Sequence, residues 1–271
     1  MNRKANHILK SLELRVARLE RQARKLKPLE IEKQIQDATH LSMVDPQLAT
    51  VLVSSGSRNQ DKIRVELAPF MASSLKPSQT TMRLRDSVEI ALKMLRGAAD
   101  SNLGAIVSND RYIMDGHHRW SGAIIAYGNK AKVNAYRADL KGSMLIRVLN
   151  ILTKGWFKIR NGNKGDGSLS LYTSDNVKEL LEEFIDVGIT GKYPVSSDEV
   201  RQTLIDNFGS IDKGIESLSS NVRHINFDVA PFAPKRQDMP VIKSKQVSEA
   251  AKILNRGEVL WTPPYPKDLE I

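Results

Sequence analysis

The stretch from Met114 to Trp120, with the sequence Met-Asp-Gly-His-His-Arg-Trp, constrains the fold of this chain more than any other part of it. Residues 111–114 alternate as in a half-buried strand, with Tyr112 and Met114 expected on one face and Arg111 and Ile113 on the other. Gly116 then breaks the strand, because glycine adopts backbone angles that other residues resist. Apolar residues next recur at the spacing of one helix face, at Trp120, Ala123, Ile124 and Tyr127, before a capping Gly128. The stretch therefore predicts a strand, a tight turn and a helix.

The first turn of this helix is expected to carry His117, His118 and Arg119. Its exposed N–H groups and the positive end of the helix dipole favour an anion, and an arginine adds a forked pair of donors. The turn is therefore a candidate seat for a phosphate. The alternative is that Asp115 only caps the helix while both histidines are solvated. Adjacent helical positions are about 100° apart, so the two histidines are not expected to chelate one zinc ion together.

This turn resembles the signature turn of the ParB/sulfiredoxin superfamily, which includes ParB partition proteins that bind CTP, sulfiredoxin and free serine kinases. With Asp115, Gly116 and two histidines it is more similar to the serine-kinase and phage-encoded ParB-like branch than to ParB, which carries a Gly-Glu-Arg-Arg type of turn. Upstream, the segment 75–79 (Leu-Lys-Pro-Ser-Gln) resembles the Pro-x-Gln segment that follows the first strand in these proteins. The two matches cover roughly residues 63–136, less than a third of the chain.

The resemblance implies an α/β (α+β) fold with a small mixed-sheet core and a nucleotide-binding site that works as a phosphotransferase or a nucleotide hydrolase. ATP or another nucleotide would be bound with Mg²⁺. Asp115 would hold the magnesium or orient an acceptor hydroxyl, and His117 or His118 would shuttle a proton. The phosphate-binding set would be Lys76, Ser78, Gln79, Gly116, His117, His118 and Arg119.

One position departs from the serine kinases. Those enzymes rely on a glutamate near the first strand as a base, whereas Gln79 cannot abstract a proton. Neither Glu66 nor Glu89 aligns with that position. Phosphorylation of free serine is therefore not expected, whereas transfer to another acceptor, hydrolysis or nucleotide binding as a switch all stay open.

The amino-acid composition excludes several classes of protein and site. The chain has no cysteine, which rules out disulfides and thiolate metal sites and fits a reducing compartment. His117 lies where sulfiredoxin uses a cysteine, so sulfinic-acid reduction is not expected. No run approaches the ~20 apolar residues of a membrane span, and the N-terminus is too polar for a secretory signal. We expect a cytoplasmic protein without a membrane partner, located in the bacterial host cytoplasm or in the virion if it is phage-encoded.

The positive charge is concentrated near the N-terminus. The net charge is +10, of which residues 1–27 hold +7, from nine Lys/Arg against two Glu. Apolar residues there follow three heptads of a/d positions: Ala5, Leu9, Leu12, Val16, Leu19, Ala23 and Leu26. This basic helix is expected to dock on its own domain, to form a homo-oligomer through a coiled coil, or to contact DNA or another anion with its arginine-rich face.

Four parts are expected along the chain: a basic N-terminal helical arm (1–40), a ParB/sulfiredoxin-like core (62–140), an accessory helical lobe (141–225) and an extended C-terminal return segment (226–271). In the core we expect a strand at 63–67, a connection bracketed by Pro69 and Pro77, a helix at 88–95, a hairpin at 105–114 and a strand at 132–136. Residues 41–61 are expected to be irregular.

Beyond the core, helices are expected at 144–152, 174–187, 196–208, 212–223 and 247–254, with Ser196 and Glu199 as a capping box and Gly257 as a terminal cap. Between the first two, the glycine-rich basic loop 158–167 lacks Walker spacing; it is a surface loop or a flap over phosphates. Residues 231–240 are extended because they hold three prolines, and their Arg-x-x-Met-Pro stretch resembles one that returns to the core in phage-encoded ParB-like proteins. In the tail, Trp261 and Tyr265 are expected to dock on the body, unless its prolines bind a partner.

Two other functions remain open. Many relatives carry the name ParB-like nuclease, and the basic arm favours DNA binding, but the sequence has no helix-turn-helix after the core and no carboxylate cluster of a two-metal nuclease. The chain is otherwise a phage virion or assembly protein, anchored by its coiled coil and retaining a vestigial site.

Overall fold

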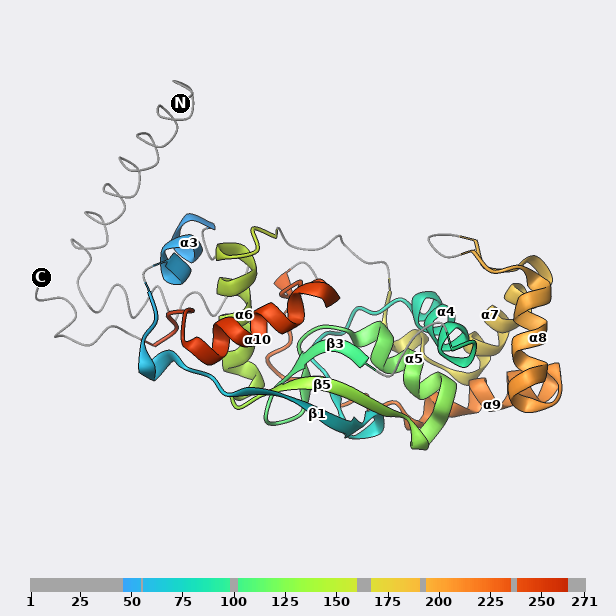
Figure 1. Cartoon of the computed structure of the whole chain (residues 1–271). Coiled ribbons are helices and arrows are strands. Elements are labelled where there is room, and N and C mark those ends of the chain that lie inside the picture. Colours follow the sequence, from blue (N-terminus) through green and yellow to red (C-terminus); the bar gives the residue numbers. More distant parts are fainter. Residues whose placement is uncertain are drawn as a thin grey trace, which may run out of the picture.

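The computed structural model describes residues 46–54, 56–97, 102–159, 167–190, 194–234 and 238–262. The arm 1–40 with its heptad pattern, most of the glycine-rich loop (160–166) and the tail after Thr262, including Tyr265, lie outside these residues. The described part is elongated, with the sheet in the middle. Helices α3, α6 and α10 lie toward one end and α7, α8 and α9 at the other (Figure 1).

Within the described residues the strands form one five-stranded mixed sheet, in the order β1-β5-β3-β4-β2. The strands are β1 (Val65–Met71), β2 (Lys76–Pro77), β3 (Asn102–Val107), β4 (Tyr112–Ile113) and β5 (Lys132–Ala138). β5 pairs antiparallel with β1 and parallel with β3, while β4 pairs antiparallel with β3 and parallel with β2. The expected α/β (α+β) class and the expected hairpin are confirmed.

One strand boundary was wrong. β1 continues through Pro69, which the sequence placed in the connection after the strand, and Pro69 stands opposite Asn134 of β5. β1 is an edge strand, so it has a hydrogen-bonded neighbour on one side only. A proline lacks the N–H donor and is tolerated at such an edge.

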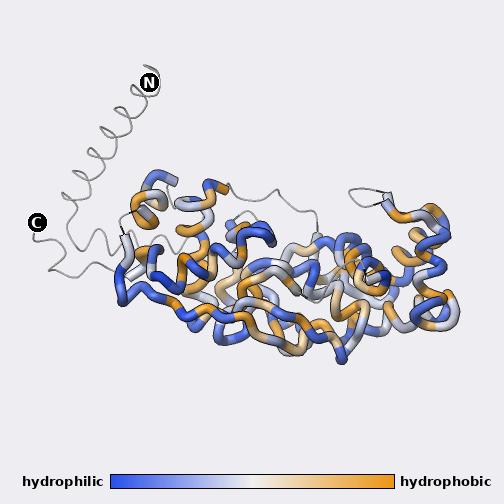
Figure 2. The backbone as a smooth tube through the Cα atoms, viewed as in Figure 1, coloured by the Kyte–Doolittle hydropathy of each residue, from blue (hydrophilic) through white to orange (hydrophobic). Residues whose placement is uncertain are grey.

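Helices cover both faces of the sheet. Alternate residues of the central strands enter two different apolar clusters: Ala105, Val107 and Ala135 belong to one, Ile106 and Ala138 to the other. The first cluster contains residues of α4 (Leu84–Leu95), α5 (His117–Tyr127), α7 (Ser174–Val187), α8 (Ser197–Phe208) and α9 (Ile211–Asn221). The second contains residues of α6 (Gly142–Gly155) and α10 (Val247–Arg256). Figure 2 shows apolar stretches in the strands and in the helices beside them.

This two-sided cover corrects the half-buried strand expected before the turn. Ile113 and Met114 are both fully buried, each in a different cluster, because the sheet has no solvent face there. The two clusters also separate α6 from α7–α9, which the sequence grouped in one helical lobe. The four predicted parts of the chain stay a prediction.

A second correction concerns α3 (Pro46–Ser54), which forms where an irregular segment was expected. α3 packs on α6, with Ala49 and Val53 buried. A Cβ atom on Gly155 would lie only 2.2 Å from the carbonyl oxygen of Ala49, so the two helices approach closely. A helix this short gains most of its stability from packing, which local sequence does not report.

Other expected elements are confirmed. α7 has the predicted bounds, and α8 begins with the capping box of Ser196 and Glu199, in which the Ser196 N–H donates to the Glu199 carboxylate at 2.9 Å. α9 begins one residue before the predicted start and ends two before the predicted end. α10 ends at Arg256 and is capped by Gly257, whose backbone is left-handed. Local patterns thus located these helices well.

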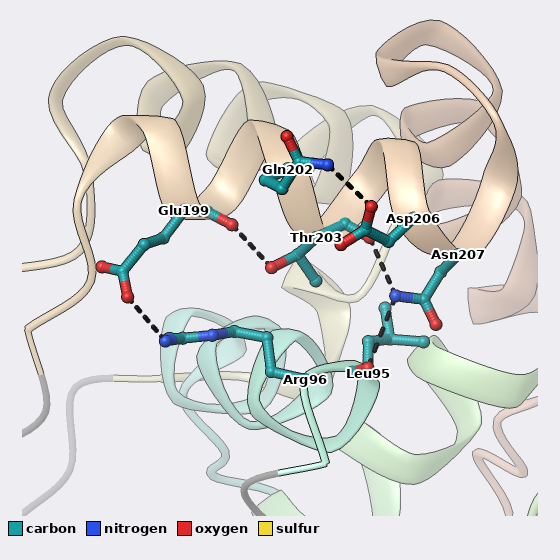
Figure 3. A pocket seen from close by; sticks show the side chains of 7 residues that line it. All are labelled: Leu95, Arg96, Glu199, Gln202, Thr203, Asp206 and Asn207. Carbon is teal, nitrogen blue, oxygen red and sulfur yellow. Dashed lines mark hydrogen bonds and ion pairs between the residues drawn. The ribbon is translucent and has the colours of Figure 1, made fainter.

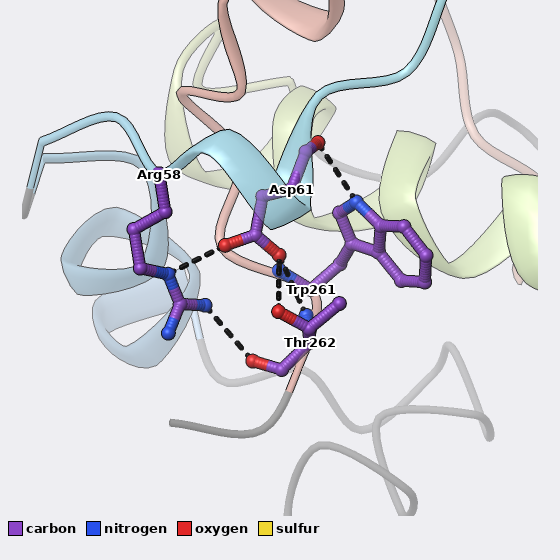
Figure 4. Close-up of polar contacts among 4 residues, drawn as sticks. All are labelled: Arg58, Asp61, Trp261 and Thr262. Carbon is purple, nitrogen blue, oxygen red and sulfur yellow. Dashed lines mark hydrogen bonds and ion pairs between the residues drawn. The ribbon is translucent and has the colours of Figure 1, made fainter. Parts of the chain in front are cut away.

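The C-terminal chain is fastened to the body by Asp61, which is 1% exposed (Figure 4). One of its carboxylate oxygens accepts the backbone N–H groups of Trp261 (3.0 Å) and Thr262 (2.8 Å), and the other accepts the Arg58 Nε–H (2.5 Å). The indole N–H of Trp261 donates to the Asp61 carbonyl oxygen at 3.0 Å. The expected docking of Trp261 is confirmed.

Candidate functional site

The turn before α5 has the predicted form. Gly116 takes a left-handed conformation (φ 87°, ψ 18°) and α5 begins at the next residue, so His117, His118 and Arg119 lie in its first turn. A Cβ atom at Gly116 would lie 3.0 Å from the Ala105 side chain, so glycine also permits the close approach to β3. Gly116 is the N-cap of α5, and His117 is only 2% exposed, so the alternative in which both histidines are solvated is not what the structure shows.

His117 joins the turn to the Pro-Ser-Gln segment. Its side chain is 2% exposed, and its Nε2 accepts the backbone N–H of Ser78 at 3.1 Å. The Ser78 hydroxyl donates to the Ile113 carbonyl oxygen at the end of β4. Ser78 and Gln79 are both buried. The turn and the Pro-Ser-Gln segment, the two motifs of the superfamily resemblance, are therefore in contact.

His118 makes the equivalent bond further along the same segment. Its Nε2 accepts the backbone N–H of Arg83 at 3.0 Å. A neutral imidazole that accepts at one nitrogen carries its proton on the other, so both histidines hold their proton on Nδ1. The pair thus fastens residues 78–83 to the start of α5.

Arg119 lies across β3. Its Nη2 donates to the Gly104 carbonyl oxygen at 3.3 Å, and its Nη1 donates to the hydroxyl of Ser244, which begins the short helical turn before α10. Gly104 has φ +49° at an irregularity of the β3–β5 pairing, and a Cβ there would lie 3.1 Å both from Arg119 Nη1 and from Ser244 Cβ. Glycine inside a strand is a sequence signal for such a close approach. Ser244 carries no local signal, and sequence reasoning missed it.

Lys76 lies in β2, and its positive charge is already paired with the carboxylate of Asp228. Its Nζ pairs with the Asp228 carboxylate at 2.5 Å and sits 5.5 Å from the centre of the Tyr112 ring. The hydrogen bond with Asp228 raises the pKa of Lys76 above its ordinary value. A phosphate would therefore compete with Asp228, a residue the sequence analysis did not single out, for this ammonium group.

The donor set for a metal is sparse. Asp115 is half-buried and directly precedes the turn. No three His, Asp or Glu side chains gather as a metal-holding group in the part of the chain that the structure describes. Mg²⁺ commonly takes one or two carboxylates together with phosphate oxygens and water. Asp115 fits magnesium only in that arrangement, with the nucleotide supplying part of the coordination.

A separate hollow of about 320 Å³ lies between the end of α4 and α8 (Figure 3). Its polar groups pair with one another: Arg96 with Glu199 at 2.8 Å, and Gln202 with Asp206 at 2.7 Å. α4 has twelve residues, a length of roughly 18 Å, and the hollow is at the opposite end from Arg83. The hollow is therefore separate from the turn that carries His118.

Comparison with known proteins adds no assignment: no protein-family model, curated protein or solved structure matches the chain. The resemblance to the ParB/sulfiredoxin superfamily stays a prediction that rests on the two motifs. Among the described residues, no helix has the length and apolar character needed to span a membrane.

Proposed function

We propose that this chain is a ParB/sulfiredoxin-like protein that binds the phosphates of a nucleotide at the turn 115–119 and transfers or hydrolyses a phosphoryl group there. The observation that carries the proposal is the bond between His117 Nε2 and the Ser78 N–H, which joins two motif segments 39 positions apart. The resemblance to the superfamily assigns both segments to one site.

The electrostatics of the turn support an anionic ligand. The first N–H groups of α5 and the guanidinium of Arg119 lie on the same turn. Gly104 and Ser244 hold that guanidinium in place, and donors fixed in advance stabilise charge on phosphoryl oxygens without reorganising.

The other predicted residues fit supporting roles. Asp115 is the residue that would hold Mg²⁺, which when bound neutralises charge on the phosphates. Nδ1 of each neutral histidine already carries a proton, so for His117 or His118 to take up another, Nε2 would first have to release the backbone N–H that it accepts. Ser78 and Gln79 would line the site opposite α5, and Lys76 would contribute its charge by exchanging Asp228 for a phosphate.

A thermal-shift screen of the full chain with ATP, ADP, CTP and GTP, with and without magnesium, tests the proposal. A ligand at a hundred times its Kd stabilises the fold by about 2.7 kcal/mol, a rise in Tm of several degrees. We expect one nucleotide to give this rise in the wild type and in Arg201→Ala, a control on α8, but not in Arg119→Ala. Arg119→Lys should give a smaller rise because lysine keeps the charge and loses the fork. If no nucleotide raises the Tm of the wild type, the proposal is wrong.

Activity is then measured as phosphate release from the nucleotide that binds. Asp115→Asn should lower the rate and weaken its dependence on magnesium while the nucleotide still binds. Unchanged rates in this variant would contradict a catalytic role for Asp115.

The second candidate, DNA binding, is favoured by the charge of +7 on residues 1–27. It predicts DNA binding that weakens steeply with salt and is lost when residues 1–27 are removed. Salt-dependent DNA binding without any nucleotide response would favour it over the first candidate.

A further inference from the structure

The loop Thr80–Arg83 is held from two sides. On one side it meets His118 of α5, through the Arg83 N–H. On the other it meets the segment 167–172 that leads into α7: the Leu169 N–H donates to the Thr80 carbonyl oxygen at 3.0 Å. A Cβ atom on Gly167 would lie 2.4 Å from the Met82 carbonyl oxygen, so the two backbones touch. The loop that contacts the candidate site is therefore also part of the packing of α7.

Tyr172 makes the most specific of these contacts. Its ring is 4% exposed, and its hydroxyl donates to the Arg83 carbonyl oxygen at 3.2 Å. The same hydroxyl is 2.7 Å from the Ser87 hydroxyl, which is 2.7 Å from the Ser121 hydroxyl. Ser121 in turn donates to the carbonyl oxygens of His117 (3.0 Å) and His118 (3.3 Å).

These contacts form a ring of residues that runs from Tyr172 to Arg83, His118, Ser121 and Ser87 and back to Tyr172. When Tyr172 donates to Arg83 and Ser121 donates to His118, the Ser87 hydroxyl donates to either Tyr172 or Ser121. Ser87 and Ser121 are completely buried, so their hydroxyls need partners within the protein, which they find in each other, in Tyr172 and in nearby backbone carbonyl oxygens. Burial raises the pKa of Tyr172 to about 12, so its hydroxyl stays protonated well above neutral pH. The ring links α4, α5 and the start of α7 at the first turn of the candidate site.

We propose that Tyr172 is a positioning residue of this site: its hydroxyl holds the Arg83 carbonyl and so fixes the backbone of Arg83, whose N–H meets His118 and thereby sets the orientation and tautomer of that imidazole. The neighbouring donors and acceptors decide which nitrogen of a neutral histidine carries the proton. When the Arg83 N–H is no longer held at Nε2, the preference for the Nδ1–H tautomer weakens. The effect on His118 is independent of any ligand, whereas the effect on nucleotide binding rests on the proposed function.

The test uses the full chain and the variant Tyr172→Phe, which removes one hydroxyl and keeps the buried ring. Nitrogen-15 NMR of the imidazole of His118, assigned with His118→Gln, should show a protonated Nδ1 and an accepting Nε2 in the wild type. In Tyr172→Phe both resonances should move toward the values of a tautomer mixture. Unchanged resonances in Tyr172→Phe would overturn the proposal.

Tyr127→Phe is the matched control. Its hydroxyl donates to the Met94 carbonyl oxygen at 3.0 Å, so it joins α5 to α4 at their other end, and its loss should leave the His118 resonances unchanged. A comparable movement in this control would show a general loosening of the helix pair and would count against Tyr172. If Tyr172→Phe does not fold, Ser87→Ala is used instead, because it removes a hydroxyl of the same ring. It should move the His118 resonances in the same way.

Nucleotide affinity gives the second readout. In Tyr172→Phe we expect roughly a three- to tenfold weaker affinity for the nucleotide that stabilises the wild type, the size of one typical hydrogen bond. If no nucleotide binds the wild type but the His118 resonances still move in Tyr172→Phe, the proposed function fails and the positioning role stands. An affinity in Tyr172→Phe equal to that of the wild type would show that the ring does not serve the nucleotide site.

Discussion

The Nε2 atom of His117 lies 3.1 Å from the backbone nitrogen of Ser78, and both residues are buried. A buried backbone N–H requires an acceptor, and here a histidine side chain supplies it in place of a neighbouring strand. The bond ties the end of β2 to the start of α5, so the shape of the candidate site depends on it.

Replacing His117 should therefore destabilise the fold. His117→Ala leaves the Ser78 N–H without its acceptor and opens a cavity, and we expect the free energy of unfolding to fall by about 2–4 kcal/mol. Urea unfolding measures it. His117→Gln should recover part of the loss because its carboxamide oxygen can accept the same N–H. The control His224→Ala, at a half-exposed position, should change the stability by less than about 0.5 kcal/mol. An equally small effect of His117→Ala would contradict this account.

Gly104→Ala should disturb Arg119 as well as the backbone. Its Cβ would meet both Arg119 and Ser244 at 3.1 Å, in a backbone conformation with φ +49°. Gly209→Ala is a suitable control, because φ there is +83° and no atom lies within 4 Å of the added Cβ. Both variants carry left-handed strain of about 1–2 kcal/mol, but only Gly104→Ala adds the contact. We expect a larger drop in Tm for Gly104→Ala and, under the proposed function, a smaller nucleotide-induced shift. Equal drops in Tm for the two variants would show that the side chains of Arg119 and Ser244 move aside without lowering the stability.

Tyr172 should make the fold sensitive to alkaline pH. Burial raises its pKa from 10.0 to about 12, so between these values the unfolded chain loses the proton first and stability falls as pH rises. The loss attributable to this group is about 1.4 kcal/mol at pH 11. Urea unfolding of the wild type and of Tyr172→Phe at pH 9 and pH 11 isolates it, because other titrating groups are common to both. A stability difference between the two proteins that is the same at both pH values would refute the assignment.

Local signals in the sequence were enough to locate many elements. Gly116 takes a left-handed conformation at the start of α5, the Ser196 and Glu199 capping box starts α8, and Gly257 caps the end of α10. Each of these works through residues only a few positions apart. The same holds for the placement of His117 and Arg119 on one helical turn.

Contacts between distant segments could be found only in the tertiary structure. α3 is helical because it packs on α6, and β1 runs through Pro69 because it is an edge strand. Ser244 contacts Arg119 of the turn from 125 positions away, and Tyr172 contacts Arg83, in the loop beside the turn, from 89 positions away. The sequence by itself determined which residues form the turn. Folding decided what surrounds them, because burial and long-range hydrogen bonds depend on the whole chain and leave no pattern in neighbouring residues.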